Sequence, residues 1–282
     1  MSAPDLASAL GVLTGMPGVA ERAEAARAAC TQLRFNEALR RRIPEAAAES
    51  RVRGAQASAA LEGADLPVDR VRDHVRGALP WPEHPDPVDE VVRGAVQATA
   101  ETEHVVGLVR TAPLQALARL HVAAAAGLLP EPQVGRPRTG VETSRELVDL
   151  GDAPPPDVVA DRLAALAALL TATTSAPAVV LAGLVHAEIA VVRPFVRGNG
   201  LVARAMERAV IQSTGLDPTG VAVPEAGHAR AGGPAYLGAL AAYASGTSAG
   251  VGLWLQQCGE AVSEAAAEGE RICAAVRAGR LR

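Results

Sequence analysis

The chain has 282 residues and a net charge of −4, enough length for one large domain or two modest ones. This mildly acidic balance, without a basic stripe interleaved with aromatic residues, argues against a nucleic-acid-binding surface. Its three widely spaced cysteines, Cys30, Cys258 and Cys273, argue against a disulfide framework, and we expect buried thiols in a cytoplasmic protein.

Helical periodicity dominates the first 128 residues. Apolar residues recur at spacings of three and four, and a composition rich in Ala, Leu, Arg and Glu favours helix. Helices are predicted over residues 20–42, 44–61, 68–79, 87–109 and 113–128. A proline-rich stretch, residues 81–87, is the predicted boundary between an N-terminal helical arm, residues 1–85, and a larger core domain, residues 86–282. The N-terminus lacks the features of a signal peptide.

Residues 129–155 interrupt this pattern with closely spaced prolines and glycines, which predict a loop with a short β-hairpin. Further helices are predicted over residues 155–173, 176–192, 201–213, 234–244 and 250–278. The uncharged stretch 163–185 is long enough for a membrane span, but its threonines and Pro177 divide it into two buried helices. We therefore expect an all-α fold with one small β-hairpin and no membrane contact.

One turn between two predicted helices combines unusual residues. Gly198 and Gly200 bracket Asn199, and glycine adopts backbone conformations that are closed to other residues. Successive N–H groups can then converge on one point at the positive end of the following helix. The turn therefore predicts an anion-binding nest.

Basic side chains surround this turn. Arg197 precedes the glycines, while Arg204 and Arg208 lie one helical turn apart in the helix that follows. Arginine binds phosphate strongly because its planar group donates two parallel hydrogen bonds. A plain helix–helix turn is the alternative interpretation of the Gly-Asn-Gly sequence.

Residues 193–204, Arg-Pro-Phe-Val-Arg-Gly-Asn-Gly-Leu-Val-Ala-Arg, resemble the signature of the Fic family, His-Pro-Phe-x-Asp/Glu-Gly-Asn-Gly-Arg-x-x-Arg. The matching residues are Pro194, Phe195, Gly198, Asn199, Gly200 and Arg204. The resemblance covers roughly residues 88–275 and includes a flap-like loop at residues 135–138. It implies a helical protein whose active relatives mostly transfer AMP from ATP to a protein hydroxyl group.

A second stretch, residues 58–63, fits the inhibitory pattern of the same family, Ser/Thr-x-x-x-Glu-Gly/Asn. Ser58 and Glu62 are four residues apart and so share one helix face, which Gly63 can terminate. In relatives this glutamate pairs with the second arginine of the signature and blocks the γ-phosphate of the nucleotide. The resemblance therefore implies that Glu62 inhibits binding through Arg204.

Three positions depart from the family signature. The family's histidine is here Arg193, its metal-holding acid is Arg197, and its first arginine is Leu201. A general base needs a free lone pair, which a guanidinium lacks, and Mg²⁺ needs oxygen ligands. We therefore assign no catalytic residue and expect no Mg²⁺ site. His121 and His228 show no zinc-binding spacing, and we expect His186 to be a buried core residue with its polar atoms paired.

These departures predict a relative of the protein adenylyltransferases that binds ATP or another nucleotide, either without catalysis or with altered chemistry. The predicted phosphate-binding residues are Arg197, Gly198, Asn199, Gly200 and Arg204, and the predicted inhibitory residues are Ser58, Glu62 and Gly63. The chain has no lysine, which indicates a GC-rich coding bias, and we expect a bacterial origin. The target protein is not specified by the sequence, and a homodimer stays open.

Two other function classes stay open. Residues 198–203 also satisfy the dinucleotide pattern G-x-G-x-x-G/A of nicotinamide-dependent oxidoreductases. That pattern needs a strand leading into the first glycine, within repeated strand–helix units, and Arg193 and Pro194 interrupt such a strand. The other class is a non-catalytic interaction scaffold with a vestigial pocket.

Overall fold

The computed structural model describes residues 3–281 of the chain. Within that range it holds twelve α-helices and three short 3₁₀ helices, and no residue lies in a β-strand. The predicted all-α fold is therefore confirmed, whereas the predicted β-hairpin is wrong.

The helices follow one another with short connections. The first half of the chain forms α1 (Ala3–Thr14), α2 (Val19–Arg34), α3 (Leu39–Leu61), α4 (Val68–Val75), α5 (Pro87–Val105), η1 (Val106–Leu108) and α6 (Pro113–Ala125). The second half forms η2 (Glu131–Gln133), η3 (Val148–Leu150), α7 (Pro156–Thr171), α8 (Ala178–Val192), α9 (Asn199–Ser213), α10 (Pro224–Arg230), α11 (Gly233–Ala244) and α12 (Ser248–Arg277). The sequence did not predict α1 or α10, and α10, with seven residues, is too short to show a periodic pattern.

Several helix starts follow from local sequence. The Asp86 side chain accepts a hydrogen bond from the Asp89 amide at 2.8 Å, and Pro87 begins α5, where its missing N–H costs nothing. The Thr247 hydroxyl caps α12 in the same way. The break predicted at Pro44 is instead a kink, because α3 passes through Pro44 with a non-helical backbone at Arg42.

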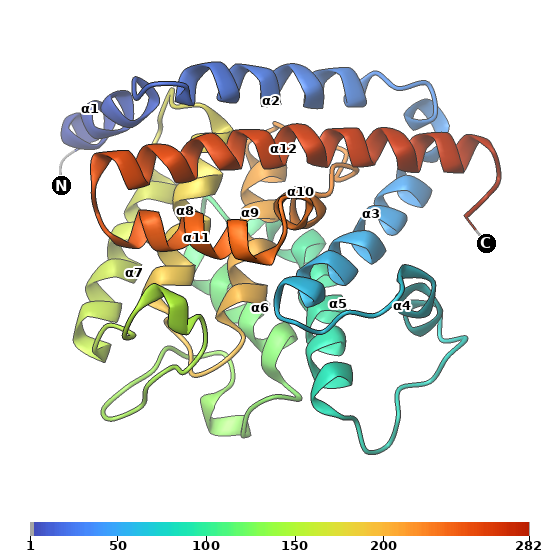
Figure 1. Cartoon of the computed structure of the whole chain (residues 1–282), viewed down its shortest axis with the longest axis horizontal. Coiled ribbons are helices and arrows are strands. Elements are labelled where there is room, and N and C mark those ends of the chain that lie inside the picture. The colour runs from blue at the N-terminus through green and yellow to red at the C-terminus, as the bar shows by residue number, and fades with distance from the viewer. Residues whose placement is uncertain (1–2, 282) are drawn as a thin grey trace.

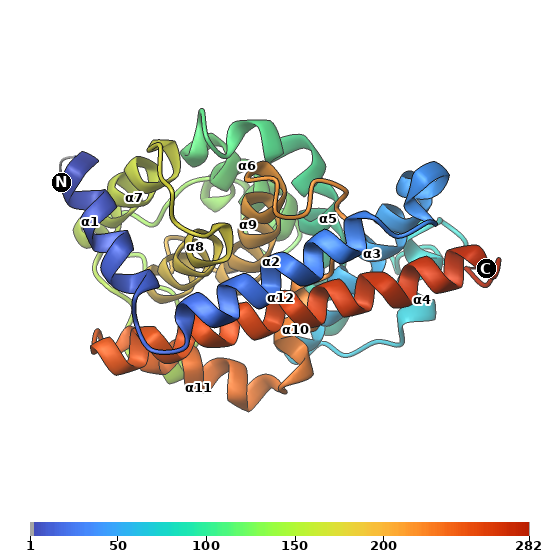
Figure 2. The same ribbon diagram turned by 90° about the horizontal axis from the view of Figure 1, so that it is seen from above.

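Helix α8 forms the centre of the molecule. Apart from His186 and Glu188 it is apolar all round, as expected for a helix packed on most sides, and it lies against α9, α12, α11 and α7. Figures 1 and 2 show α2 and α12 side by side along one face, with α8 and α9 crossing beneath them. The turn between α8 and α9 lies at the end of α8 away from this face, beside the loop that follows α6 (Figure 1).

The helices before and after residue 85 contribute to one hydrophobic core. In particular, α3 packs against α5, α10 and α12, so its C-terminal end is brought close to the turn before α9. The boundary predicted at residues 81–87 falls in the loop between α4 and α5 and stays a prediction. No helix within residues 3–281 is both long and apolar enough to cross a membrane.

The predicted hairpin region is an irregular loop held by side chains. Prolines at positions 130, 132 and 137 lack the N–H group that a strand ladder requires. The buried Arg138 side chain instead donates to the carbonyl groups of Arg193 at 2.7 Å and Pro154 at 2.9 Å. The Arg138 amide donates to the Pro194 carbonyl at 2.7 Å. These bonds fasten the loop directly to the turn between α8 and α9.

Candidate anion-binding site

The turn between α8 and α9 is fixed by its own backbone and by Asn199. Gly198 has φ +85°, a left-handed conformation that glycine adopts without strain, and it caps the N-terminus of α9. The Asn199 side chain accepts from the Phe195 amide and donates to the Phe195 carbonyl, both at 2.9 Å. The amides of Gly198 and Asn199 are thereby aimed at one point at the start of α9.

A carboxylate of the chain itself lies at that point. Glu146, in the loop after α6, accepts hydrogen bonds from the Gly198 amide at 2.7 Å and from the Asn199 amide and side-chain Nδ2, both at 2.9 Å. The amides predicted to bind phosphate therefore donate to a carboxylate of the chain itself, and phosphate binding stays a prediction. Sequence reasoning missed Glu146, because no pattern links it to a turn about fifty residues later.

Burial and a second carboxylate change the protonation of Glu146. Removal from water raises its pKa, the negative charge of Glu62 raises it further, and the donors at Gly198 and Asn199 oppose both effects. The net pKa is above the ordinary value. Glu146 is thus held in the nest at an electrostatic disadvantage, and a stronger anion could compete with it.

Helix α3 brings Glu62 to Arg204 from the other side. The Arg204 Nη2 group donates to Glu62 Oε1 at 2.7 Å and to the Ser58 carbonyl at 3.0 Å, and its Nε donates to Ser58 Oγ at 2.8 Å. Its Nη1 donates to the Tyr236 hydroxyl at 3.2 Å. Arg204 is buried, and its charge is balanced mainly by Glu62, which is partly exposed.

Gly200 leaves room for this contact. A Cβ atom at position 200 would lie 2.1 Å from Glu62 Oε1 and 3.2 Å from Arg204 Nη1. Any larger residue would push the Glu62 carboxylate away from the first turn of α9. The second glycine of the turn is thus needed for the approach of Glu62, whereas the first is needed for the backbone conformation.

Arg197 and Arg208 do not join the site as predicted. The Arg197 side chain is exposed, and only its carbonyl is fixed, by a hydrogen bond of 3.0 Å from His121 Nε2. Arg208 forms a buried two-bond pair with Glu225 at 2.8 and 2.7 Å. A guanidinium at position 197 offers a metal ion no oxygen ligand, so the chain does not fit Mg²⁺ at the position where the family holds it.

Arg193 is turned towards the loop after α6. It ends α8 in a left-handed conformation, φ +45°, with a side chain that is 1% exposed. Its Nη1 group donates to the carbonyl groups of Glu146 at 3.2 Å, Leu147 at 3.2 Å and Gly151 at 2.8 Å. The residue at the family's base position is therefore a structural donor here.

His121 supports the turn from α6. Its ring stacks on Phe195 with centroids 3.7 Å apart, and its Nδ1 accepts from the Gly135 amide at 2.9 Å. Because Nδ1 is an acceptor, Nε2 must carry the proton that it donates to the Arg197 carbonyl. Burial lowers the pKa of His121 to about 4. The neutral ring thus connects the loop to the turn.

This lowered pKa predicts acid destabilisation between pH 6.5 and pH 4. The unfolded chain binds a proton at His121 in that window while the folded chain does not, so stability falls as the pH falls. The loss attributable to His121 is on the order of 3 kcal/mol at pH 4. Urea unfolding at several pH values checks this, with His121→Gln expected to flatten the pH dependence. An unchanged slope in that variant would contradict it.

A second polar cluster lies in the core beside Arg204. His186 Nδ1 and His228 Nε2 both donate to Glu207 Oε2, at 2.6 and 2.8 Å, and the Tyr236 hydroxyl donates to His186 Nε2 at 2.7 Å. Burial outweighs the attraction of Glu207 and lowers the pKa of His186 to about 4. Through Tyr236 the cluster is hydrogen-bonded to Arg204.

The three residues His186, Glu207 and His228 place one potential metal ligand atom each within 4.8 Å of the others. The N–O separations of 2.6 and 2.8 Å are shorter than the about 3.3 Å between ligands around a tetrahedral zinc. Both ring protons point at the same oxygen. The geometry is that of a hydrogen-bonded triad rather than a metal site.

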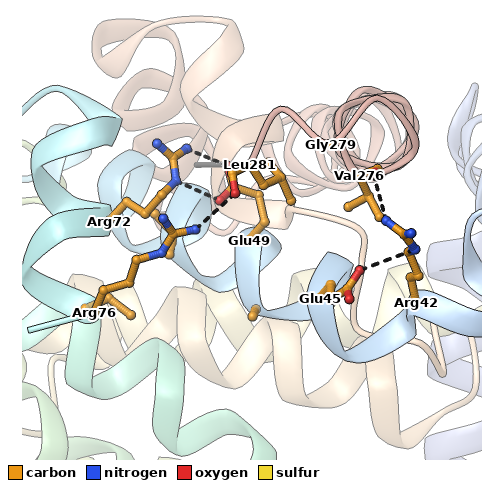
Figure 3. Close-up of a pocket in the computed structure, with 11 residues that line it drawn as sticks. Arg42, Glu45, Glu49, Arg72, Arg76, Val276, Gly279 and Leu281 are labelled. Atoms are coloured by element: carbon orange, nitrogen blue, oxygen red, sulfur yellow. Dashed lines mark hydrogen bonds and ion pairs between the residues drawn. The ribbon is translucent and has the colours of Figure 1, made fainter.

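A cavity of about 450 Å³ lies elsewhere, between α3, α4 and the end of α12 (Figure 3). Its charged lining is already paired, since Glu49 accepts from Arg72 at 3.0 and 2.7 Å and Arg42 donates to the Val276 carbonyl at 3.1 Å. The residues that line it do not include the turn before α9. We therefore do not assign this cavity to the anion site.

The fold is shared with known structures. A Fic family protein from Desulfovibrio desulfuricans G20 superposes with a TM-score of 0.71 at 22% identity, covering 91% of this chain and 75% of that one. Fic-1 from C. elegans superposes with a TM-score of 0.67 at 16% identity, covering 93% and 73%. The chain folds as a Fic domain. A Fic-domain-containing signaling protein from Bacteroides thetaiotaomicron VPI-5482 agrees, with a TM-score of 0.62 at 11% identity, covering 90% and 98%.

No family profile and no curated protein sequence matches this chain, so the similarity to Fic proteins rests on the fold. The Fic fold also bears on the dinucleotide pattern at residues 198–203. The segment leading into Gly198 is helix α8 and a turn, and no strand lies within residues 3–281. The glycines thus lack the strand that a dinucleotide fingerprint requires.

Proposed function

We propose that this Fic-domain protein binds a nucleotide or a related phosphate compound between the start of α9 and Arg204, under the control of Glu62. The observation that supports the proposal is the pair of carboxylates in this site: Glu146 on the backbone amides and Glu62 on Arg204. Phosphate oxygens accept from the same kinds of donors as carboxylates. Two anion-binding elements on one helix suit a ligand with several phosphate groups.

The chemistry of the site supports binding without the family's usual AMP transfer. Arg193 has no lone pair and is committed to three loop carbonyl groups, so it takes no proton from a hydroxyl group. The exposed Arg197 supplies no oxygen to a metal ion. We place the protein in the cytoplasm, in keeping with its three free, buried cysteines.

A non-catalytic scaffold is the second candidate. It is favoured by the fact that the donors of the site already have partners within the chain. In a vestigial site these partners would simply be permanent. Nucleotide binding by a variant without Glu62 separates the two functions.

Replacing Glu62 by glycine is expected to raise the affinity for ATP and ADP by about tenfold, because one charge-assisted hydrogen bond to Arg204 no longer competes. Isothermal titration calorimetry with and without Mg²⁺ measures this, and equal affinities are expected since position 197 holds no acid. Glu83→Gly, in the exposed loop before α5, is the matched control. If neither ATP nor ADP binds to these proteins or to a variant that lacks both Glu62 and Glu146, whose carboxylate lies on the backbone amides, the scaffold function is correct instead.

A further inference from the structure

The loop after α6 places an acid where the site's ligand should bind. We propose that Glu146 is a second inhibitory plug, separate from Glu62, and that Arg193 is the positioning residue that locks it in the nest. This inference rests on the proposed function, since a plug matters only where a ligand binds. The proposal gives Arg193, which stands where the Fic signature has its histidine, a role in closing the site.

The two carboxylates block different donors. Glu146 accepts from backbone amides at the start of α9, whereas Glu62 accepts from the guanidinium of Arg204, about one and a half turns further along the same helix. Burial raises the pKa of Glu146, and the negative charge of Glu62 raises it further. A ligand with two or more phosphate groups must therefore displace both acids to reach all the donors. Removing Glu62 alone opens half of the site.

Arg193 holds the plug by its backbone. Its guanidinium binds the carbonyl groups of Glu146, Leu147 and Gly151, on both sides of the short helix η3. Leu147 (φ +50°) and Arg193 (φ +45°) are the only residues other than glycine with positive φ in the part of the chain that the structure describes. A left-handed backbone conformation is disfavoured for any residue that carries a Cβ atom. Two strained residues thus meet at one contact, which is typical of a functional position.

Apart from the packing of η3 against α11, few apolar contacts hold the loop closed. Val141 is 101% exposed and Val148 is 69% exposed, so these two apolar side chains contribute little to the core. Leu147 and Leu150 are only partly buried against the core. A segment with few buried apolar contacts opens at a lower free energy than the helices around it. Polar contacts to Arg193, to Arg138 and to the amides of the nest therefore determine whether the Glu146 carboxylate occupies the nest or leaves it.

Amide hydrogen exchange tests the plug without any ligand. In Glu146→Ala the amides of Gly198 and Asn199 lose their acceptor, and their exchange is expected to accelerate by about tenfold or more. Arg193→Met should have the same effect, whereas Arg193→Lys, which keeps a cationic donor, should retain most of the protection. Glu131→Ala, an exposed acid of the same loop, is the control. Unchanged exchange in Glu146→Ala overturns the plug.

Titration with inorganic triphosphate tests the inhibition. We expect Glu62→Gly and Glu146→Ala each to bind about tenfold more tightly than the natural chain, and the double variant about a hundredfold. A double variant that binds no better than Glu62→Gly overturns the second plug and leaves the proposed function standing. Absence of binding by every variant refutes the proposed function and with it the inhibition. Thermal unfolding of each variant shows that the fold is kept.

Discussion

Replacing Arg208 by methionine is expected to destabilise the protein by about 3–5 kcal/mol, because it leaves Glu225 as an unpaired buried charge. Both side chains are 1% exposed, and their two hydrogen bonds of 2.8 and 2.7 Å join α9 to α10. Urea unfolding of the natural chain and the variant measures the difference. The effect should exceed that of any surface ion pair, whose contribution is about 0–1 kcal/mol.

Two further variants show whether the loss comes from the unpaired charge. Removing both partners, in Arg208→Met with Glu225→Leu, should recover most of the stability, since hydrophobic replacement of a whole buried pair is often neutral. Ser50, which Arg208 also contacts, keeps its own hydrogen bond to the Ala222 carbonyl. The exposed pair Arg22 and Glu260 supplies the control, Glu260→Gln. A double variant as unstable as the single one would mean that packing, not charge, is decisive.

The Arg208–Glu225 pair illustrates where sequence reasoning stopped. Spacing correctly put Arg204 and Arg208 on one helix, one turn apart, and the expectation that both serve the anion site followed from that. The two arginines pair with different acids, because the C-terminal end of α3 brings Glu62 to Arg204 while α10 brings Glu225 to Arg208. Periodicity describes one helix at a time, and α10 was too short to be predicted at all.

The turn before α9 was more predictable than its surroundings. Gly198 takes the left-handed conformation that a nest requires, and Glu62 lies on Arg204 as the paired patterns imply. Both follow from local chemistry and a family signature. The position of Glu146 depends on a long irregular loop and on Arg138 and Arg193, which bind carbonyl groups rather than acids. A guanidinium that binds backbone carbonyl groups has no acidic partner in the sequence, so a charge pattern cannot predict such a contact.

Replacing Glu207 by leucine is expected to cost about 3–5 kcal/mol, because it strands two buried histidine N–H donors at once. His186 and His228 both donate to Glu207 Oε2, and Glu207 Oε1 has no hydrogen-bond partner among the described residues. Both hydrogen bonds of the carboxylate are therefore made by one oxygen atom. The pKa of Glu207 is well below its ordinary value because both rings stabilise the ionised form against burial. Thermal and urea unfolding measure the loss.

Glu207→Gln separates hydrogen bonding from charge at this position. Its carbonyl oxygen can still accept from both rings, so it should cost less than leucine, and the difference between the two variants gives the contribution of the hydrogen bonds. The remaining loss is that of the charge, which balances a core containing the buried Arg204. Glutamine should also remove the acid sensitivity that the lowered pKa of Glu207 contributes below about pH 4.5, where the unfolded chain protonates first. If glutamine and leucine are equally destabilising, the hydrogen bonds to Glu207 add nothing and the charge alone stabilises the triad.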